Sequence, residues 1–129
     1  MNLRYFNNND FINAIPSCSI DDMDLTFMIM LDTARHRSGQ LSQMEGESCV
    51  YVINSAFRTV EYELSKGRSG SSSHTKRVAV DIRYRSSREC YYIVSGLLFA
   101  GFHRIGIGNG FIHVDIDDSK DGRVIFNYY

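Results

Sequence analysis

The chain has 129 residues, of which 43% are hydrophobic and 22% are charged. This length and composition predict one folded domain, residues 1–129, with a hydrophobic core of its own, and they exclude a chain that is disordered throughout. Fourteen Lys and Arg residues against fifteen Asp and Glu residues give a net charge of -1 at pH 7. No overall basic field therefore favours nucleic acid or an anionic membrane as a partner.

The content of cysteine and histidine limits the kind of metal site that the chain could build. Its three cysteines are far apart, odd in number and without a C-x-x-C pair. This pattern argues against a disulfide framework and against a zinc site made of thiolates. A bound metal would have to be held by carboxylates and by histidines, of which there are four: His36, His74, His103 and His113.

The N-terminal segment gives no sign of export or of membrane insertion. It lacks the basic start and apolar run of a secretory signal, and no stretch of the chain is long and apolar enough to span a bilayer. We therefore expect synthesis in the cytoplasm without a signal peptide and no membrane span. Residues 1–18 are expected to form a loosely structured extension.

Capping signals and apolar spacing predict the elements of the first half. A helix is expected over about 21–36, after the capping residue Ser19, and cations followed by Gly39 predict its end. The β-branched and aromatic residues 49–54 predict a buried strand, and a short helix should cover 59–66 and stop at Gly67. The Gly/Ser-rich residues 68–73 predict a surface loop.

The second half predicts one further helix and four strands. Residues 78–83 alternate apolar and polar side chains, and a capping box at 86–89 opens a helix that should run to about 100. Strands are expected at 102–107, 111–116 and 123–128, with hairpin turns at 108–110 and 118–122. This order predicts an α+β domain, with helices packed on one side of an antiparallel sheet.

Two of these strands carry polar residues on the face that should point away from the core. Asp81 alternates with Val80 and Ile82, and His113 shares its strand face with Asp115. If His74 folds back over this face, two histidines and a carboxylate could bind zinc and leave its fourth position open. On spacing alone, the alternative is favoured, in which Asp81 pairs with a base such as Arg83 and the histidines are ordinary polar residues.

Three ordered motifs strengthen the metal interpretation. The segment from Ser72 to Asp81 resembles the S-x-H-x-x-G-x-A-x-D signature of the zinc D-Ala-D-Ala carboxypeptidase and endolysin peptidase family, which shares its fold with the hedgehog signalling domain. Residues 54–59 are similar to the S-x-[FY]-R-[ST] segment that precedes this signature. Residues 101–107 and 111–115 resemble the closing G-F-x-R-I-G and [FI]-H-V-D segments of a small subgroup.

The resemblance implies roles for particular residues. His74, Asp81 and His113 would bind one Zn²⁺ ion, and Arg58 would be a catalytic and substrate-binding cation beside the scissile carbonyl, stabilising its oxyanion. On the residues alone, Arg58 would instead pair with a nearby glutamate, Glu61 or Glu63. Ser72 would orient His74 or contact the substrate.

The sequence departs from the family pattern at two positions. Arg77 stands where the family usually has Gly, which puts a long cation near the expected metal site. Gly110 stands three residues before His113, where many members carry a glutamate as general base. Asp115 is the nearest replacement, either as the catalytic base or as a partner that orients a ligand histidine.

The sequence therefore predicts a single-domain zinc peptidase that hydrolyses a bond in the stem peptide of bacterial peptidoglycan. The alternative is a zinc-containing binding or structural module of the same fold that has lost hydrolysis. The chain resembles the short forms found in bacteriophage and their hosts, so a lysin that reaches the cell wall after its release fits the pattern.

Overall fold

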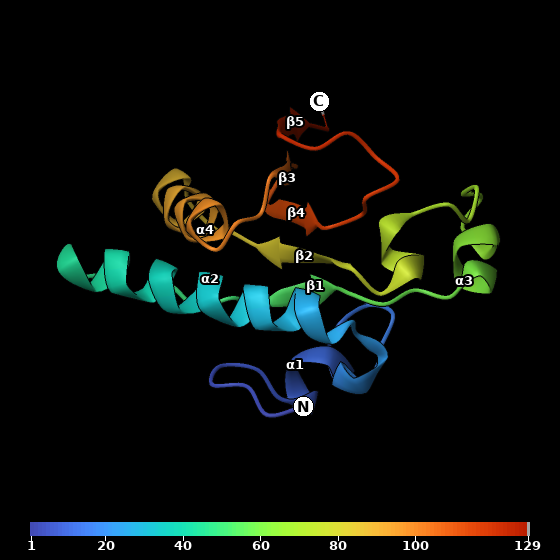
Figure 1. Ribbon diagram of the computed structural model, residues 1–129, viewed down its shortest axis with the longest axis horizontal. Coiled ribbons are helices and arrows are strands. Elements are labelled where there is room, and N and C mark those ends of the chain that lie inside the picture. The colour runs from blue at the N-terminus through green and yellow to red at the C-terminus, as the bar shows by residue number, and fades with distance from the viewer. Residues whose placement is uncertain (129) are drawn as a thin grey trace.

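A computed structural model describes residues 1–128 as an α+β fold (Figure 1). The helices are α1 (Asn8–Ile12), α2 (Leu25–Met44), α3 (Val60–Ser65) and α4 (Ser87–Phe99), with single 3-10 turns η1 (Ile20–Asp22) and η2 (Ser73–Lys76). The strands are β1 (Ile53–Ser55), β2 (Ala79–Arg83), β3 (Arg104–Ile107), β4 (Phe111–Asp115) and β5 (Val124–Asn127). Among the described residues, no helix combines the length and apolar character needed to cross a bilayer.

The strands form one five-stranded, mostly antiparallel sheet in the order β1-β2-β4-β3-β5. Because side chains alternate along each strand, β2 and β4 send Val80, Ile82, Ile112 and Val114 to one face, where all four are fully buried. These residues join the buried side chains of α2 and α4 in a single core cluster. The opposite face of the same two strands carries Asp81, His113 and Asp115 together with Ala79 and Phe111.

The C-terminal strand does not pair as the sequence suggests. A hairpin joins β3 to β4, as expected, but β5 pairs in parallel with β3 and does not form a hairpin with β4. The reason is that β4 is already bonded to β2 on one edge and to β3 on the other. The segment after β4 therefore crosses to the free edge of β3, and the sheet is mixed (Figure 1).

The helix expected over 21–36 also differs from the sequence interpretation. Ser19 caps the short turn η1, whereas α2 begins after its own cap, Asp24, and continues to Met44. Ser38 and Gly39 do not end this helix. Both lie within its residue range and are buried against the rest of the fold. Ser38 Oγ donates to the Tyr92 carbonyl of α4 at 2.7 Å, so tertiary packing overrides the local stop signal.

The N-terminal segment contributes a short helix and two aromatic side chains to the fold. Asn7 and Asp10 form a capping box around α1, and Phe6 and Phe11 are buried in the common core. Asp32 of α2 accepts hydrogen bonds from the backbone N–H groups of Arg4 and Tyr5. Residues 1–18 therefore pack as part of the fold.

Candidate metal centre

Two of the three candidate ligands face each other on neighbouring strands of the sheet. Asp81 of β2 lies directly opposite His113 of β4, and His113 lies opposite Gly106 of β3. The remaining ligand, His74, comes from η2, whose turn ends shortly before β2 begins. The sheet therefore fixes two of the three residues, and the turn before β2 folds the third over them.

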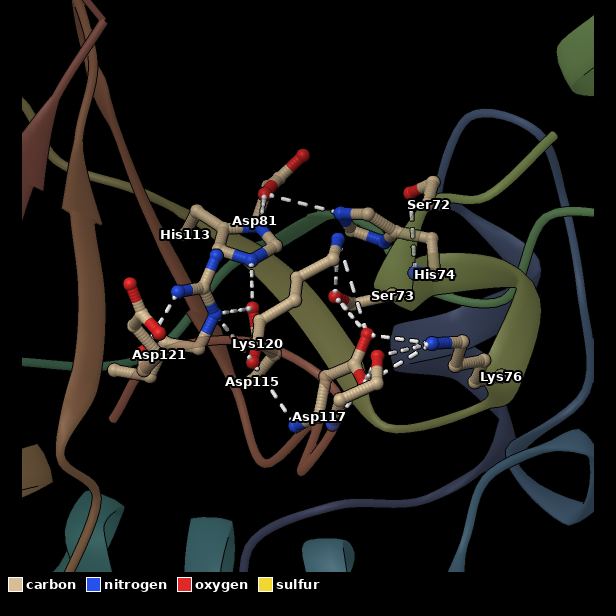
Figure 2. Close-up of polar contacts among 12 residues, drawn as sticks. Ser72, Ser73, His74, Lys76, Asp81, His113, Asp115, Asp117, Lys120 and Asp121 are labelled. Atoms are coloured by element: carbon tan, nitrogen blue, oxygen red, sulfur yellow. Dashed lines mark hydrogen bonds and ion pairs between the residues drawn. The ribbon is translucent and has the colours of Figure 1, made fainter. Parts of the chain in front are cut away.

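His74, Asp81 and His113 form a group that could hold a metal ion, and one ligand atom from each lies within 4.8 Å of the others. Asp81 Oδ1 is 3.3 Å from His74 Nε2 and 3.0 Å from His113 Nδ1. Figure 2 shows the carboxylate of Asp81 between the two imidazole rings. Both histidines are buried, and the structure thus joins all three residues that the sequence singles out.

The second nitrogen of each imidazole is held by a hydrogen-bond acceptor. His74 Nδ1 donates to the Ala56 carbonyl at 2.7 Å, and His113 Nε2 contacts Asp115 Oδ2 at 2.6 Å. A carbonyl can only accept, so the proton of neutral His74 is on Nδ1 and the lone pair of Nε2 faces Asp81. Acceptors that fix the ring orientation in this way are typical of metal-binding histidines.

The electrostatics of the triad favour a cation at its centre. Burial opposes the charged form of Asp81, but hydrogen bonds from His113 and His74 outweigh it and hold the pKa of this carboxyl well below its usual range. Burial also opposes charge on His113, but Asp115 and Asp81 outweigh it and raise the pKa of the imidazole. A hydrogen bond to Asp81 requires a proton on the imidazole nitrogen that faces it, and a bound metal ion would take the place of that proton.

A buried carboxylate fixes the position of η2, the turn that carries His74. Asp117 accepts hydrogen bonds from Ser73 Oγ at 2.8 Å and from Lys76 Nζ at 3.0 Å (Figure 2). Its backbone N–H donates to Asp115 Oδ1 at 3.0 Å. The loop after β4 thereby connects the partner of His113 with the residue beside His74.

Arg77 occupies a backbone conformation that favours glycine. Its φ is +70°, in the left-handed region that glycine adopts most readily. The side chain turns toward the N-terminal segment, where Nη1 donates to the Asp22 carbonyl and the guanidinium lies 4.2 Å from the ring centre of Phe57. Arg77 is not among the residues that line the cleft at the triad, so the expectation that the Arg77 side chain puts a cation near the metal site is wrong.

The triad lies in the wall of an open cleft of about 490 Å³. Arg58, Ser72 and the rest of the Gly/Ser loop line the same cleft. Ser72 Oγ caps η2 by accepting from the backbone N–H of His74, and it also accepts from Arg58 Nη2 at 3.4 Å. Arg58 Nε lies 3.3 Å from Glu63, so Arg58 both forms the ion pair considered from the sequence and faces the cleft.

An aromatic wall made of Phe111, Phe126 and Tyr128 closes another side of the cleft. Gly106 makes this wall possible, because a Cβ at that position would lie 2.5 Å from the Phe126 ring. The ring centres of Phe126 and Tyr128 lie 6.2 and 6.5 Å from that of His113. Burial, followed by the charges of Asp81 and Asp115, raises the pKa of the Tyr128 phenol to about 12, so it remains protonated at neutral pH.

The geometry favours the orienting role for Asp115 over the role of general base. Asp115 is buried and contacts His113 Nε2, which is the nitrogen away from Asp81. Arg104 Nε lies 3.1 Å from its Oδ1. Asp115 does not line the cleft, and Gly110 has no side chain that could supply a carboxylate in its place.

The other histidines and the cysteines lie outside the triad. His36 Nδ1 bonds to the Tyr5 hydroxyl, and His103 Nδ1 accepts from the backbone N–H of Arg123. The three cysteines are free, and burial raises the pKa of each thiol: Cys18, Cys49 and Cys90. These thiols are therefore weak nucleophiles at neutral pH.

Sequence reasoning missed several residues that build the site. They are Arg68, Arg104, Asp117, Lys120, Phe126 and Tyr128. Arg104 lies in the G-F-x-R-I-G segment, which was a usable signal, and Asp117 continues the alternation that places His113 and Asp115 on one face. The aromatic residues gave no such signal, because their position depends on the parallel pairing of β5 with β3.

No family model matches the chain, and no curated protein matches it in sequence.

Proposed function

We propose that this chain is a zinc-dependent peptidase that hydrolyses a peptide bond in the stem peptides of bacterial peptidoglycan. The observation that carries the proposal is the convergence of His74, Asp81 and His113 in the wall of an open cleft. Two imidazole nitrogens and one carboxylate oxygen are the ligand set of a catalytic zinc site that keeps one position open. When bound there, zinc supplies a Lewis acid that polarises a carbonyl and lowers the pKa of water.

Residues around the triad have separate parts in the proposed reaction. Arg58 is the cation that stabilises negative charge developing on the scissile carbonyl, and Glu63 and Ser72 hold its guanidinium in place. Asp115 orients His113 and keeps the Nδ1 lone pair directed toward Asp81. The proton of the Tyr128 phenol is available at the opposite wall of the cleft as a hydrogen-bond donor.

The choice of peptidoglycan rests on the ordered sequence motifs. Residues 54–59, 72–81, 101–107 and 111–115 resemble the corresponding segments of peptidoglycan peptidases in the same order. The folded chain brings residues of all four segments to or near the cleft, including Arg58, Arg104 and the triad. A short lysin that reaches the wall after release from the cell is the form of the protein that we favour.

A specific observation also favours a second function, a metal-containing binding module without hydrolytic activity. Among the described residues that line the cleft, the carboxylates are Asp81 and Glu63. Asp81 belongs to the triad, and Glu63 is paired with two arginines. Residues 1–128 therefore give the cleft no free carboxylate for proton transfer, which a peptidase of this kind ordinarily uses.

The test combines metal analysis with digestion of purified peptidoglycan. We expect one zinc per chain by elemental analysis, release of new amino groups from peptidoglycan, and loss of this release when a chelator removes the metal. The variant Asp81→Ala should lose both zinc and activity, whereas Asp118→Ala, at an exposed position outside the cleft, should keep both. Bound zinc without chelator-sensitive cleavage would support the binding module, and absence of zinc would overturn both functions.

A further inference from the structure

We propose that Arg68 binds a carboxylate of the peptide that occupies the cleft. The inference rests on the proposed function, because it assumes that a peptide lies beside the triad. It adds a residue outside the sequence motifs and assigns a chemical class to the ligand, an acidic peptide group.

Glu63 fixes Arg68 at the wall of the cleft. The Glu63 side chain is fully buried, with 0% of its surface exposed, and its two oxygens meet two different guanidinium groups. Arg68 Nη1 lies 2.6 Å from Oε2, and Arg58 Nε lies 3.3 Å from Oε1. The backbone N–H of Arg68 also donates to the Glu63 carbonyl at 2.9 Å, so both ends of Arg68 are tied to the same residue.

The charges around Glu63 do not cancel. A buried carboxylate requires one compensating cation, but Glu63 has two. Arg58 is mostly covered, with 15% of its side chain exposed, and its Nη2 donates to Ser72. Arg68 is 49% exposed and meets Glu63 through Nη1 alone, so the excess positive charge is accessible at Arg68.

A further guanidinium group of the cleft, that of Arg104, is 16% exposed and pairs with Asp115. Lys120 is an ammonium group that shares Asp117 with Lys76 and donates to Ser73 Oγ at 3.0 Å, so it does not offer the planar fork of a guanidinium. Within the described part of the chain, the side chain of Arg68 pairs with Glu63. Among residues 1–128, Arg68 is therefore the accessible guanidinium of this cleft. A ligand that carries a negative charge would neutralise it.

The chemistry next to Arg68 suits a carboxylate. A guanidinium has five N–H donors in a planar fork that matches the two oxygens of a carboxylate. The neighbouring loop adds hydroxyl groups, with Ser69 Oγ and Ser71 Oγ bonded to each other at 2.7 Å, and it brings no acidic side chain. The carboxylate could be the C-terminus of the peptide or the side chain of an acidic residue, and the experiment separates these sources.

The test measures equilibrium binding by calorimetry to the zinc-loaded protein, with small ligands that contain no stem-peptide bond to cleave. N-acetyl-D-alanine and its amide compare a C-terminal carboxylate with a neutral group. N-acetyl-D-glutamic acid α-amide and N-acetyl-D-glutamine α-amide make the same comparison for a side chain. We expect one of the two acids to bind on the order of tenfold more tightly than its amide, because a charge-assisted hydrogen bond is lost in the amide.

Variants separate Arg68 from the metal as the source of this preference. Arg68→Gln should weaken binding of the preferred acid on the order of tenfold and leave binding of the amide unchanged. Arg68→Lys keeps a cation for Glu63 and should lose part of the preference. Arg88→Gln is the matched control, because Arg88 is exposed, pairs with Glu47 and does not line the cleft.

The outcomes distinguish the inference from the proposed function. Equal binding of acids and amides by the wild-type protein, or full acid preference in a folded Arg68→Lys or Arg68→Gln variant, would overturn the role of Arg68. Hydrolysis of peptidoglycan could still occur in that case. Conversely, acid preference that depends on Arg68 in a protein that cleaves nothing would uphold the binding role and reject the peptidase.

Discussion

His113 lies between two carboxylates that have different roles. Asp81 Oδ1 lies 3.0 Å from Nδ1 and is itself a candidate ligand, whereas Asp115 Oδ2 lies 2.6 Å from Nε2 on the other side of the ring. Figure 2 shows the imidazole between these two groups. A neutral histidine that donates from Nε2 presents its Nδ1 lone pair to the metal position, so Asp115 determines which nitrogen can bind.

Substitution of Asp115 tests whether this residue acts on the metal or on the substrate. Asp115→Asn keeps an acceptor for His113 but removes the charge that strengthens the hydrogen bond. We expect zinc affinity to fall by about tenfold to a hundredfold, as for other partners of metal-binding histidines. Competition with a chromophoric chelator measures this change.

The matched variant is Asp121→Asn, because the backbone carbonyl and not the side chain of Asp121 accepts from Arg104. It should bind zinc as tightly as the wild-type protein. If Asp115→Asn instead keeps full zinc affinity and loses only peptide hydrolysis, Asp115 acts as the base and the orienting role is wrong.

At the scale of elements, helices α2 and α4 cross at a very close contact. Gly96 of α4 lies over α2, and a Cβ at this position would be 2.5 Å from the Ala34 carbonyl oxygen. Ser38 of α2 fills the neighbouring space and donates to the Tyr92 carbonyl. The absence of a side chain at Gly96 therefore sets the separation of the two helices that cover the sheet.

Alanine substitutions at two helical glycines should have opposite effects. Gly96→Ala inserts a methyl group against backbone and should lower the free energy of unfolding by about 1–3 kcal/mol. In Gly39→Ala the new Cβ meets only the mobile end of Arg35, so the better helix propensity of alanine should leave stability unchanged or raise it by about 0.5–1 kcal/mol. Urea unfolding measures both, and an equal loss in the two variants would contradict the close contact.

The link between the β4–β5 loop and η2 should make stability depend on pH. Burial opposes ionisation of Asp117, but hydrogen bonds from Ser119, Ser73 and Lys76 outweigh it and hold the pKa of its carboxyl below the usual range. A lowered pKa in the folded state stabilises the fold above the ordinary pKa of about 4, and this contribution is lost as the pH falls through the lowered pKa.

Asp117→Asn should therefore destabilise the protein most at neutral pH. We expect a loss of roughly 1–3 kcal/mol near pH 7, because Lys76 loses a charged partner, and a smaller difference from the wild-type protein as the pH falls below about 4. Chemical unfolding at several pH values provides the measurement. Asp118→Asn, at the exposed neighbouring position, should show neither effect, and a loss that does not vary with pH would rule out the charge of Asp117 as its cause.

At the scale of the whole molecule, local patterns predicted the elements better than their assembly. Alternation along β2 and β4 placed Asp81 and His113 on the face away from the core, and the capping residues located α3 and α4 closely. These patterns succeed because each depends on neighbours in sequence. Asp81 and His113 lie opposite each other because β2 and β4 are neighbours in the sheet.

The remaining features depend on contacts that no short segment contains. The polar turn at 118–122 is equally compatible with a hairpin, and only the occupied edges of β4 direct β5 to β3. Ser38 and Gly39 resemble a helix end until α4 packs against them. The sequence offers Glu61 and Glu63 equally as partners of Arg58, and the burial of Glu63 between two arginines follows only from the placement of the Gly/Ser loop.

The position of β5 gives the cleft two parts with different resistance to local opening. The ligand-bearing strands β2 and β4 each have a neighbour on both edges, whereas β5, which carries Phe126, pairs with β3 alone. Segments with fewer partners open at a lower free energy. In amide hydrogen exchange, β5 should therefore lose protection long before β2 and β4, so that Phe126 and Tyr128 can detach and re-form while Phe111, Asp81 and His113 stay in register.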